Sequence, residues 1–274
     1  MNTCWASDEI EKVFRGISTK PFYIFGTGII GTRFYEALKE KNLLGWFRGF
    51  VVSQKKESGF MTEPVFFPDE IMNDNQSIIC IAVHESILNE VYESLKSRGL
   101  NNTIWIYPYL LELELGPPVK LNLKKNVTAL VSGINRINPY AIYYLAIEDI
   151  DVGNGIGRDA YLWLYLRGNT VGTAKARLEK LESIIKAFDK EIVLNYPIRI
   201  NTEENTVADG AHRLMLARYY GLDEIACDIY RFDEKRFVER MKWFFVSDEE
   251  IRNTLPAGTA EGIRFVVEKL RNGR

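Results

Sequence analysis

The segment Asp209-Gly210-Ala211-His212-Arg213 brings a carboxylate, a glycine, an imidazole and a guanidinium together at the start of a stretch with helical periodicity. Gly210 permits backbone angles that are closed to other residues. A helix start offers unpaired amide groups and the positive end of the helix dipole, and both attract phosphate. His212 and Arg213 add donors on the same turn, and an arginine can bind phosphate through two parallel hydrogen bonds. The segment therefore predicts a phosphate-binding turn. The structural alternative makes Asp209 a helix cap and Arg213 one half of a surface ion pair.

A second glycine-rich turn, GTGIIG at residues 26–31, follows a short apolar run and precedes an amphipathic stretch. In this strand–turn–helix context Gly26 allows a tight turn and Gly28 lets a phosphate approach the backbone, while Gly31 lets the helix pack close to the strand. The next expected strand ends at Ser53, without the acidic residue that would take the ribose hydroxyls of NAD. The three glycines are therefore candidate ligand-binding residues, and a purely structural turn is the alternative.

Both turns need strands and helices to position them, and the hydrophobic pattern supplies candidates in each half of the chain. In the first half we expect a helix after the glycine turn, a second helix near 85–98, and strands at 22–25, 49–53, 77–83 and 102–108. Such alternation predicts a parallel sheet that is covered on both faces. In the second half we expect a helix at 173–188, a strand at 196–200, a short strand at 206–208, a helix at 209–221 and a final strand at 224–232.

The chain of 274 residues is long enough for two compact units. The sequence Gly-Pro-Pro at 116–118 interrupts regular structure and stiffens a connection. We therefore predict an α/β protein with one domain at residues 1–115, a linker at 116–138 and a second domain at 139–274.

Charge and cysteine content limit the classes of function. The formal net charge is −2 at pH 7, which disfavours a nucleic-acid partner. Cys4, Cys80 and Cys227 lie far apart and no pair has metal-ligand spacing, so we expect no metal site built by the protein alone. The N-terminus lacks the order of a signal peptide, and no apolar stretch approaches the roughly 20 residues that cross a bilayer. These features predict a cytoplasmic protein without a membrane partner.

The first half resembles the Rossmann domains that accompany sugar-nucleotide enzymes of bacterial surface glycans, including the N-terminal domains of PglD-type sugar acyltransferases. The similarity covers roughly residues 20–110 and rests on IFGTGIIG, GFVVS, PVFFPDEI and SIICIAVHESI. Such domains generally have GFVDD where this chain has GFVVS. The resemblance implies a Rossmann-like parallel sheet whose glycine turn faces a nucleotide or sugar nucleotide.

The second half resembles the ParB/sulfiredoxin fold over roughly residues 140–232. In that family a Pro-Ile strand pairs with a strand that leads into a phosphate-binding turn and a helix, as PIRI and TVADGAHRLMLARYYG do here. The resemblance implies an α+β domain in which the turn 209–213, Ala211 included, holds nucleotide phosphates. The family's preceding helix often presents a lysine and a serine to the nucleotide, and Lys180 and Ser183 match that spacing, with a solvated helix face as the alternative.

The branches of this fold can be compared at the turn. Ala211 stands where sulfiredoxin has its nucleophilic cysteine, so sulfinic-acid repair is not expected. Only residues 233–274 follow the unit, too few for both the helix-turn-helix and the dimerisation parts of chromosome-partition ParB proteins. The free-serine kinases carry an Asp-Gly-x-His-Arg turn similar to 209–213. That resemblance implies phosphoryl transfer from ATP or ADP, or from CTP, with Mg²⁺, to a small alcohol.

Phosphoryl transfer needs clamped phosphates, a metal that shares their charge and a carboxylate that takes the hydroxyl proton. In those kinases a glutamate near the start of the domain takes the hydroxyl proton. Glu148 and Asp149 are the candidates here, and the alternative is that either is an ordinary acid at the end of a strand. Asp209 could hold Mg²⁺ through water or cap the helix. The stretch 153–169 is unlike a serine kinase: its aromatic residues alternate at strand spacing, and we expect them to pack against the helix 173–188. The acceptor is therefore left open among polyols, sugars and amino acids.

The sequence thus predicts a nucleotide-dependent small-molecule kinase in surface-glycan biosynthesis, fused behind a Rossmann-like domain. A non-catalytic nucleotide sensor and a ParB-like nucleic-acid-associated protein are the alternatives. A sugar-nucleotide reductase in the first domain is disfavoured by Ser53 and by the lack of a Tyr-x-x-x-Lys pair near the expected place. The sequence leaves a homodimer open.

Overall fold

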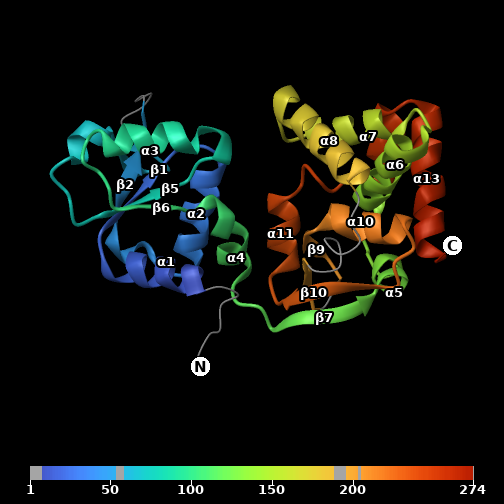
Figure 1. The fold of residues 1–274 in the computed structure, drawn as a ribbon, viewed down its shortest axis with the longest axis horizontal. Coiled ribbons are helices and arrows are strands. Elements are labelled where there is room, and N and C mark those ends of the chain that lie inside the picture. The colour runs from blue at the N-terminus through green and yellow to red at the C-terminus, as the bar shows by residue number, and fades with distance from the viewer. Residues whose placement is uncertain (1–7, 54–58, 188–195, 203–204, 274) are drawn as a thin grey trace. The chain divides into compact units, whose positions relative to one another are not determined.

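The computed structural model describes residues 8–53, 59–187, 196–202 and 205–273. The chain is an α/β protein with parallel and antiparallel strand pairs, and it divides into two compact units, Met1–Pro117 and Pro118–Arg274 (Figure 1). Each unit has its own sheet and its own buried core.

The first unit is built on a six-stranded sheet in the order β3-β4-β2-β1-β5-β6. All neighbours are parallel except β3 and β4, which form an antiparallel pair at one edge. The strands are β1 (Phe22–Phe25), β2 (Phe47–Val51), β3 (Gly59–Phe60), β4 (Glu63–Phe66), β5 (Ile78–Ile81) and β6 (Thr103–Trp105). The strands β2 to β4 lie on one side of β1, and β5 and β6 lie on the other. The strand order therefore switches between β2 and β5, which both pair with β1.

Helices cover both faces of this sheet. Phe22 and Ile24 of β1 join a core with the helices on one face, and Tyr23 and Phe25 join a second core on the other, because successive side chains of a strand point to opposite faces. The first core takes residues from α1 (Asp8–Thr19), α2 (Ile29–Glu40) and α4 (Leu110–Leu115), and the second from α3 (Leu88–Lys96). Burial on both faces explains why the parallel strands are apolar runs. Short 3₁₀ turns are η1 (Leu44–Trp46), η2 (Pro68–Ile71), η3 (Glu85–Ile87) and η4 (Tyr107–Tyr109).

The second unit has a four-stranded mixed sheet in the order β7-β10-β8-β9. β10 pairs with β7 antiparallel and with β8 parallel, and β8 and β9 form an antiparallel pair. The strands are β7 (Lys120–Asn126), β8 (Ile198–Asn201), β9 (Val207–Asp209) and β10 (Glu224–Tyr230). β9 leads directly into α10 (Ala211–Tyr219), so the sheet delivers the segment 209–213 to a helix start.

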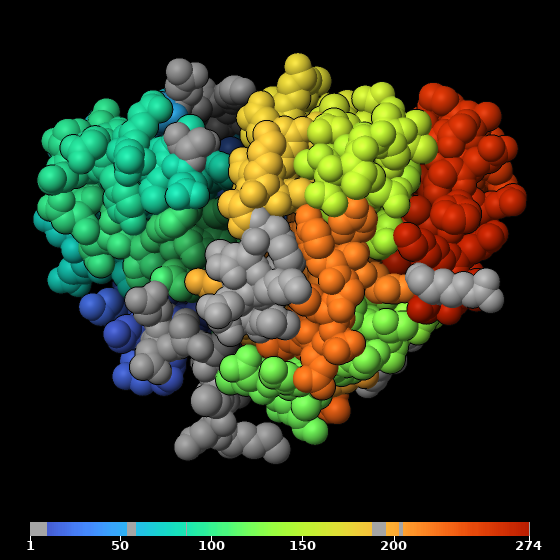
Figure 2. All heavy atoms as spheres, turned by 45° about the vertical axis from the view of Figure 1, so that its right-hand side comes forward, coloured from blue at the N-terminus to red at the C-terminus, as the bar shows by residue number. Residues whose placement is uncertain are grey.

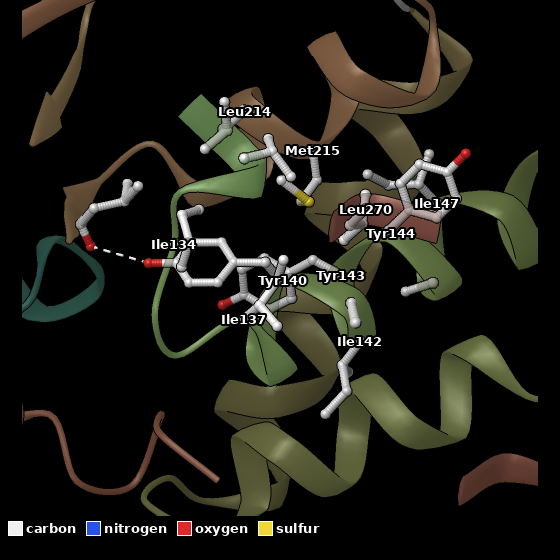
Figure 3. Packing of buried hydrophobic residues seen from close by; sticks show 14 of the residues in the cluster. Ile134, Ile137, Tyr140, Ile142, Tyr143, Tyr144, Ile147, Leu214, Met215 and Leu270 are labelled. Carbon is white, nitrogen blue, oxygen red and sulfur yellow. Dashed lines mark hydrogen bonds between the residues drawn. The ribbon is translucent and has the colours of Figure 1, made fainter. Parts of the chain in front are cut away.

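The core of the second unit forms around α6 (Asn138–Val152), in which residues 139–147 are all buried. This helix packs against α7 (Gly157–Leu166), α8 (Val171–Lys186), α10 and α13 (Ala257–Arg271). Figure 3 shows side chains of α6 beside Leu214 and Met215 of α10 and Leu270 of α13, and the Tyr140 hydroxyl donates to the Val207 carbonyl oxygen at 3.5 Å. The remaining helices are α5 (Val127–Ser132), α11 (Glu234–Arg240) and α12 (Asp248–Thr254).

Three sequence expectations need correction. Residues 138–152 form a helix, so Glu148 and Asp149 do not end a strand, and the residues from Tyr161 to Tyr165 lie in helix α7 despite their alternation. A helix that is covered on nearly all sides has no polar stripe, so its period is hidden in the sequence. The segment 116–138, expected as a linker, contains β7 and α5, and the chain divides after Pro117. Residues 120–124 of β7 are exposed, which explains why they lacked the sequence signature of a core strand.

Candidate functional site

The turn between β9 and α10 has the backbone geometry that its glycine suggests. Gly210 is the N-cap of α10 and lies in the left-handed region, with φ +90° and ψ 19°. A Cβ atom at this position would collide with the side chain of Ile198 in β8. Glycine is therefore required for two reasons: the positive φ disfavours other residues, and β8 lies too close to leave room for a side chain. The turn is consequently packed directly onto the sheet.

Asp209 and Arg213 form an ion pair across this turn, with 3.0 Å between Oδ2 and Nη2. Nη1 of Arg213 also donates to the carbonyl oxygens of Tyr196 at 2.6 Å and Pro197 at 3.0 Å. No side chain caps the start of α10, so Asp209 does not act as its N-cap. The structural alternative expected an ion pair of Arg213 and a helix cap by Asp209. The ion pair is present, and the cap by Asp209 is not. Arg213 therefore links the two residues that precede β8 to α10, and this is a structural role that is separate from any contact with a ligand.

His212 is held on two sides by aromatic residues of other helices. Its ring stacks on Tyr143 of α6 with centroids 4.2 Å apart and planes inclined by 7°, and its Nε2 lies 2.9 Å from the hydroxyl of Tyr161 in α7. Burial and the positive charges of Arg177, Lys180 and Arg213 lower the pKa of His212 to about 3. The imidazole is therefore neutral at physiological pH.

The three cations that act on His212 come from two helices, Arg177 and Lys180 from α8 and Arg213 from α10. Arg177 and Lys180 lie three residues apart on α8, which places them on the same side of that helix. Both are exposed, and neither forms an ion pair with any residue that the structure describes. Figure 2 shows α8, in gold, at the surface of the second unit. Lys180 was expected from the sequence; Arg177 was not, although its spacing from Lys180 was available as a signal.

Ser183, the other expected residue of α8, lies one turn beyond Lys180. It is exposed, and its hydroxyl donates to the carbonyl oxygen of Glu179 in its own helix at 2.9 Å. This back-bond is a common arrangement for a helical serine. The structure therefore gives Ser183 a local partner, and no contact with the turn 209–213 marks it as part of the site.

The two expected catalytic carboxylates have different surroundings. Asp149 is buried, its Oδ1 accepts from the N–H of Gly155 at 2.8 Å, and its Oδ2 accepts from the N–H of Arg158 at 2.9 Å. The Arg158 guanidinium lies 3.2 Å from Oδ1. Because α7 begins at Gly157, Asp149 serves the start of that helix. Both of its oxygens are occupied in this role.

Glu148 is half-buried and accepts one hydrogen bond from Nδ2 of Asn154 at 3.2 Å. Burial and Asp151 raise the pKa of Tyr219, and the negative charge of Glu148 raises it further. Tyr219 ends α10, whereas the turn 209–213 begins it. The charges of Lys180 and Arg177 thus act on His212 in the first turn of α10, whereas the charge of Glu148 acts on Tyr219 at the other end of that helix.

The glycine turn of the first unit lies at the carboxyl end of β1, between β2 and β5. Gly26 has φ +108°, Gly28 is the N-cap of α2, and a Cβ at Gly31 would collide with the Gly26 carbonyl oxygen. The first and third glycines are therefore needed to join β1 to α2, whereas a Cβ at Gly28 would meet nothing within 4 Å. Arg33 on α2 is held by Glu114 through two hydrogen bonds of 2.8 and 2.7 Å. The carboxyl edge of a parallel sheet at its switch point is where such folds bind ligands.

The chain matches no protein-family model, and comparisons with curated proteins and with solved structures also give no match. Among the described residues, no helix combines the length and the apolar composition that crossing a membrane requires. The same residues contain no cluster of three or more histidine, cysteine, aspartate or glutamate side chains able to hold a metal ion. The functional argument therefore depends on the geometry of the turn and its neighbours.

Proposed function

We propose that the second unit binds nucleotide phosphates at the start of α10 and transfers a phosphoryl group to a small hydroxyl acceptor. The proposal is carried by the positive charges of Arg177, Lys180 and Arg213, which all lower the pKa of His212 in the first turn of that helix. Two of these cations have no carboxylate partner among the described residues. A di- or triphosphate would neutralise them and would also accept hydrogen bonds from the free amides of the first turn of α10.

ATP or ADP is the expected phosphoryl donor, with CTP as the alternative nucleotide. Mg²⁺ bound to nucleotide phosphates usually takes one or two protein carboxylates and completes its shell with water, so it needs no dedicated cage. Asp209 is the carboxylate at the turn that fits this requirement, since its side chain is 47% exposed. Bound there, Mg²⁺ would neutralise part of the phosphate charge. Asp209 would then exchange its ion pair with Arg213 for a contact with the metal.

The hydroxyl proton of the acceptor needs a base. Asp149 is a poor candidate, because both of its oxygens already accept hydrogen bonds at the start of α7. Glu148 remains the candidate from the original pair. The acceptor class stays open among polyols, sugars and amino acids, and nothing in the site selects one of them.

A non-catalytic nucleotide sensor is the second candidate. It is favoured by the structural use of Asp149 and by the location of Glu148 near Tyr219 instead of near the turn. In that case the same three cations would bind the nucleotide, and no base would be needed. The near-balanced net charge of −2 continues to disfavour a nucleic-acid-associated protein.

The wider assignment follows from the resemblances. We propose that the first unit is a Rossmann-like domain whose turn at Gly26, Gly28 and Gly31 faces a sugar nucleotide, because its strand order places this turn at the switch point between β2 and β5. We propose a ParB/sulfiredoxin-like fold for the second unit, because β8, β9, α10 and β10 follow the expected order. A role in surface-glycan assembly in the cytoplasm fits this combination.

The kinase and the sensor are separated by a transfer assay. The full-length protein is incubated with Mg²⁺ and ATP labelled on the γ-phosphate, together with panels of polyols, sugars and amino acids, and labelled products are separated. The kinase proposal predicts label in one acceptor class and a large loss of transfer in Glu148→Gln. Nucleotide binding without transfer to any acceptor would establish the sensor. Transfer that is unchanged in Glu148→Gln would exclude Glu148 as the base.

A further inference from the structure

Three buried tyrosines pack together and reach His212. The hydroxyls of Tyr143 and Tyr165 lie 2.8 Å apart, and the ring of Tyr165 packs against the ring of Tyr161. Tyr161 in turn contacts Nε2 of His212 at 2.9 Å. Tyr143, Tyr161 and Tyr165 are all buried, and their rings pack against one another with centroids 4.8 to 6.2 Å apart. The hydroxyls therefore have few alternative partners.

The contact with Tyr161 decides where the neutral imidazole carries its single proton. If Tyr161 donates, Nε2 is an acceptor and the proton is on Nδ1; if Tyr161 accepts, the proton is on Nε2. Nδ1 forms no hydrogen bond within the described residues. The ring is half-buried, and the positive charges of Arg177, Lys180 and Arg213 act on it. A ligand drawn to these cations is anionic, and a bare Nδ1 would present a lone pair to it, whereas Nδ1–H would donate to it.

We propose that the Tyr161 hydroxyl donates to Nε2 of His212 and thereby holds the imidazole in the tautomer that is protonated on Nδ1, where it donates a hydrogen bond to a phosphate oxygen of the nucleotide. This inference rests on the proposed nucleotide site and adds a positioning residue to it. Tyr161 does not touch the ligand; it fixes which nitrogen of His212 carries the proton. The stack on Tyr143 fixes the plane of the same ring.

Nitrogen-15 NMR of the imidazole groups tests the tautomer directly, because protonated and bare nitrogens of a neutral imidazole have widely separated shifts. The chain contains two histidines, so the spectrum is simple, and His84 of the first unit serves as an internal reference. The ligand-free full-length protein is expected to show His212 protonated on Nδ1 at neutral pH. Tyr161→Phe, which keeps the ring and removes the hydroxyl, is expected to move the proton to Nε2 in part or completely.

Tyr219→Phe is the matched control, because its hydroxyl donates to Asp151 at the other end of α10. This control is expected to leave the His212 shifts unchanged. Pyrophosphate and ATP are expected to move the Nδ1 signal of His212. Tyr161→Phe is expected to weaken ATP binding roughly three- to tenfold, the range for one lost hydrogen bond.

A wild-type spectrum with the proton on Nε2 would overturn the inference even if ATP binds, and it requires no variant. If His212 is protonated on Nδ1 but its Nδ1 shift does not change when ATP saturates the protein, the proposed contact with the phosphate is overturned. If neither ATP nor pyrophosphate binds, the nucleotide site itself fails, and the donor role fails with it. That result is distinguishable from the first, because the tautomer is measured without ligand.

Discussion

The imidazole of His212 lies face to face with the phenol ring of Tyr143, with centroids 4.2 Å apart and planes inclined by 7°. Tyr143 is a buried residue in the centre of α6, whereas His212 is in the first turn of α10. The half-exposed turn is therefore anchored to the core of the unit. Donors that are fixed in advance lose less conformational entropy when a phosphate binds.

The neutral state of His212 predicts a specific dependence of stability on pH. Its pKa is about 3 in the folded protein and close to 6.5 in an unfolded chain. Below pH 6.5 the unfolded chain binds a proton at His212 and the folded protein does not. The contribution of neutral His212 to the free energy of unfolding is therefore fully present above pH 6.5 and is lost as the pH falls toward 3. At pH 5 the loss is about 2 kcal/mol. Urea unfolding at pH 7 and pH 5 measures it.

His212→Gln is the comparison for this experiment, because glutamine does not titrate in this range. The variant is expected to be less stable at pH 7 but to lose about 2 kcal/mol less than the wild type between pH 7 and pH 5. Equal acid sensitivity of the two proteins would show that His212 is accessible and titrates normally in the folded state.

Gly210→Ala is expected to destabilise the second unit by about 2–4 kcal/mol, because the left-handed φ of +90° is strained for alanine and the new Cβ collides with Ile198. Gly221→Ala provides the matched control. Gly221 follows the same helix with φ +67°, and a Cβ there would meet nothing within 4 Å, so alanine meets only the backbone strain, about 1 kcal/mol. Denaturant unfolding of both variants gives the comparison, and equal losses would mean that β8 does not pack against the turn as described.

Asp149→Asn tests whether this carboxylate holds the start of α7. The amide replaces one acceptor oxygen by a donor, so one of the N–H groups of Gly155 and Arg158 loses its partner, and the ion pair to Arg158 is lost as well. The expected loss of stability is about 2–4 kcal/mol. Glu148→Gln, in the neighbouring and more exposed position, is expected to cost less than about 1 kcal/mol. A fully stable Asp149→Asn variant without activity would instead restore Asp149 as a catalytic residue.

The local features of this fold could be predicted from the sequence. Gly210 and Gly26 lie between a short apolar run and a helical period, and both occupy left-handed or otherwise restricted positions in the structure. The elements 196–232 follow the expected order because each is marked by its own pattern and turn residues. α6 could not be assigned in the same way, since burial on nearly all sides removes the polar stripe that reveals a helix.

The neighbours of His212 could not be found from the sequence. Tyr161 contacts His212 across 51 positions of the chain, and Tyr143 comes from a helix still further away. Packing alone brings these side chains together. Lys180 could be proposed from a family pattern, and Arg177 only from its spacing to Lys180. The position of Glu148 relative to the turn depended on the direction of α6, which the sequence does not reveal.

The central claim is that an exposed cluster of cations at the start of α10 binds nucleotide phosphates. The most direct measurement is calorimetric titration of the wild type and of the double variant Arg177→Ala/Lys180→Ala with ATP, ADP and CTP in the presence of Mg²⁺. These two residues are preferred to Arg213, which also fastens residues 196 and 197. Lys175→Ala removes one exposed charge from the same helix and is the control, since Lys175 is not among the cations that act on His212. We predict that the wild type and Lys175→Ala bind at least one nucleotide, and that the double variant binds it at least about tenfold more weakly. Equal binding by all three proteins, or no binding by the wild type, would contradict the claim.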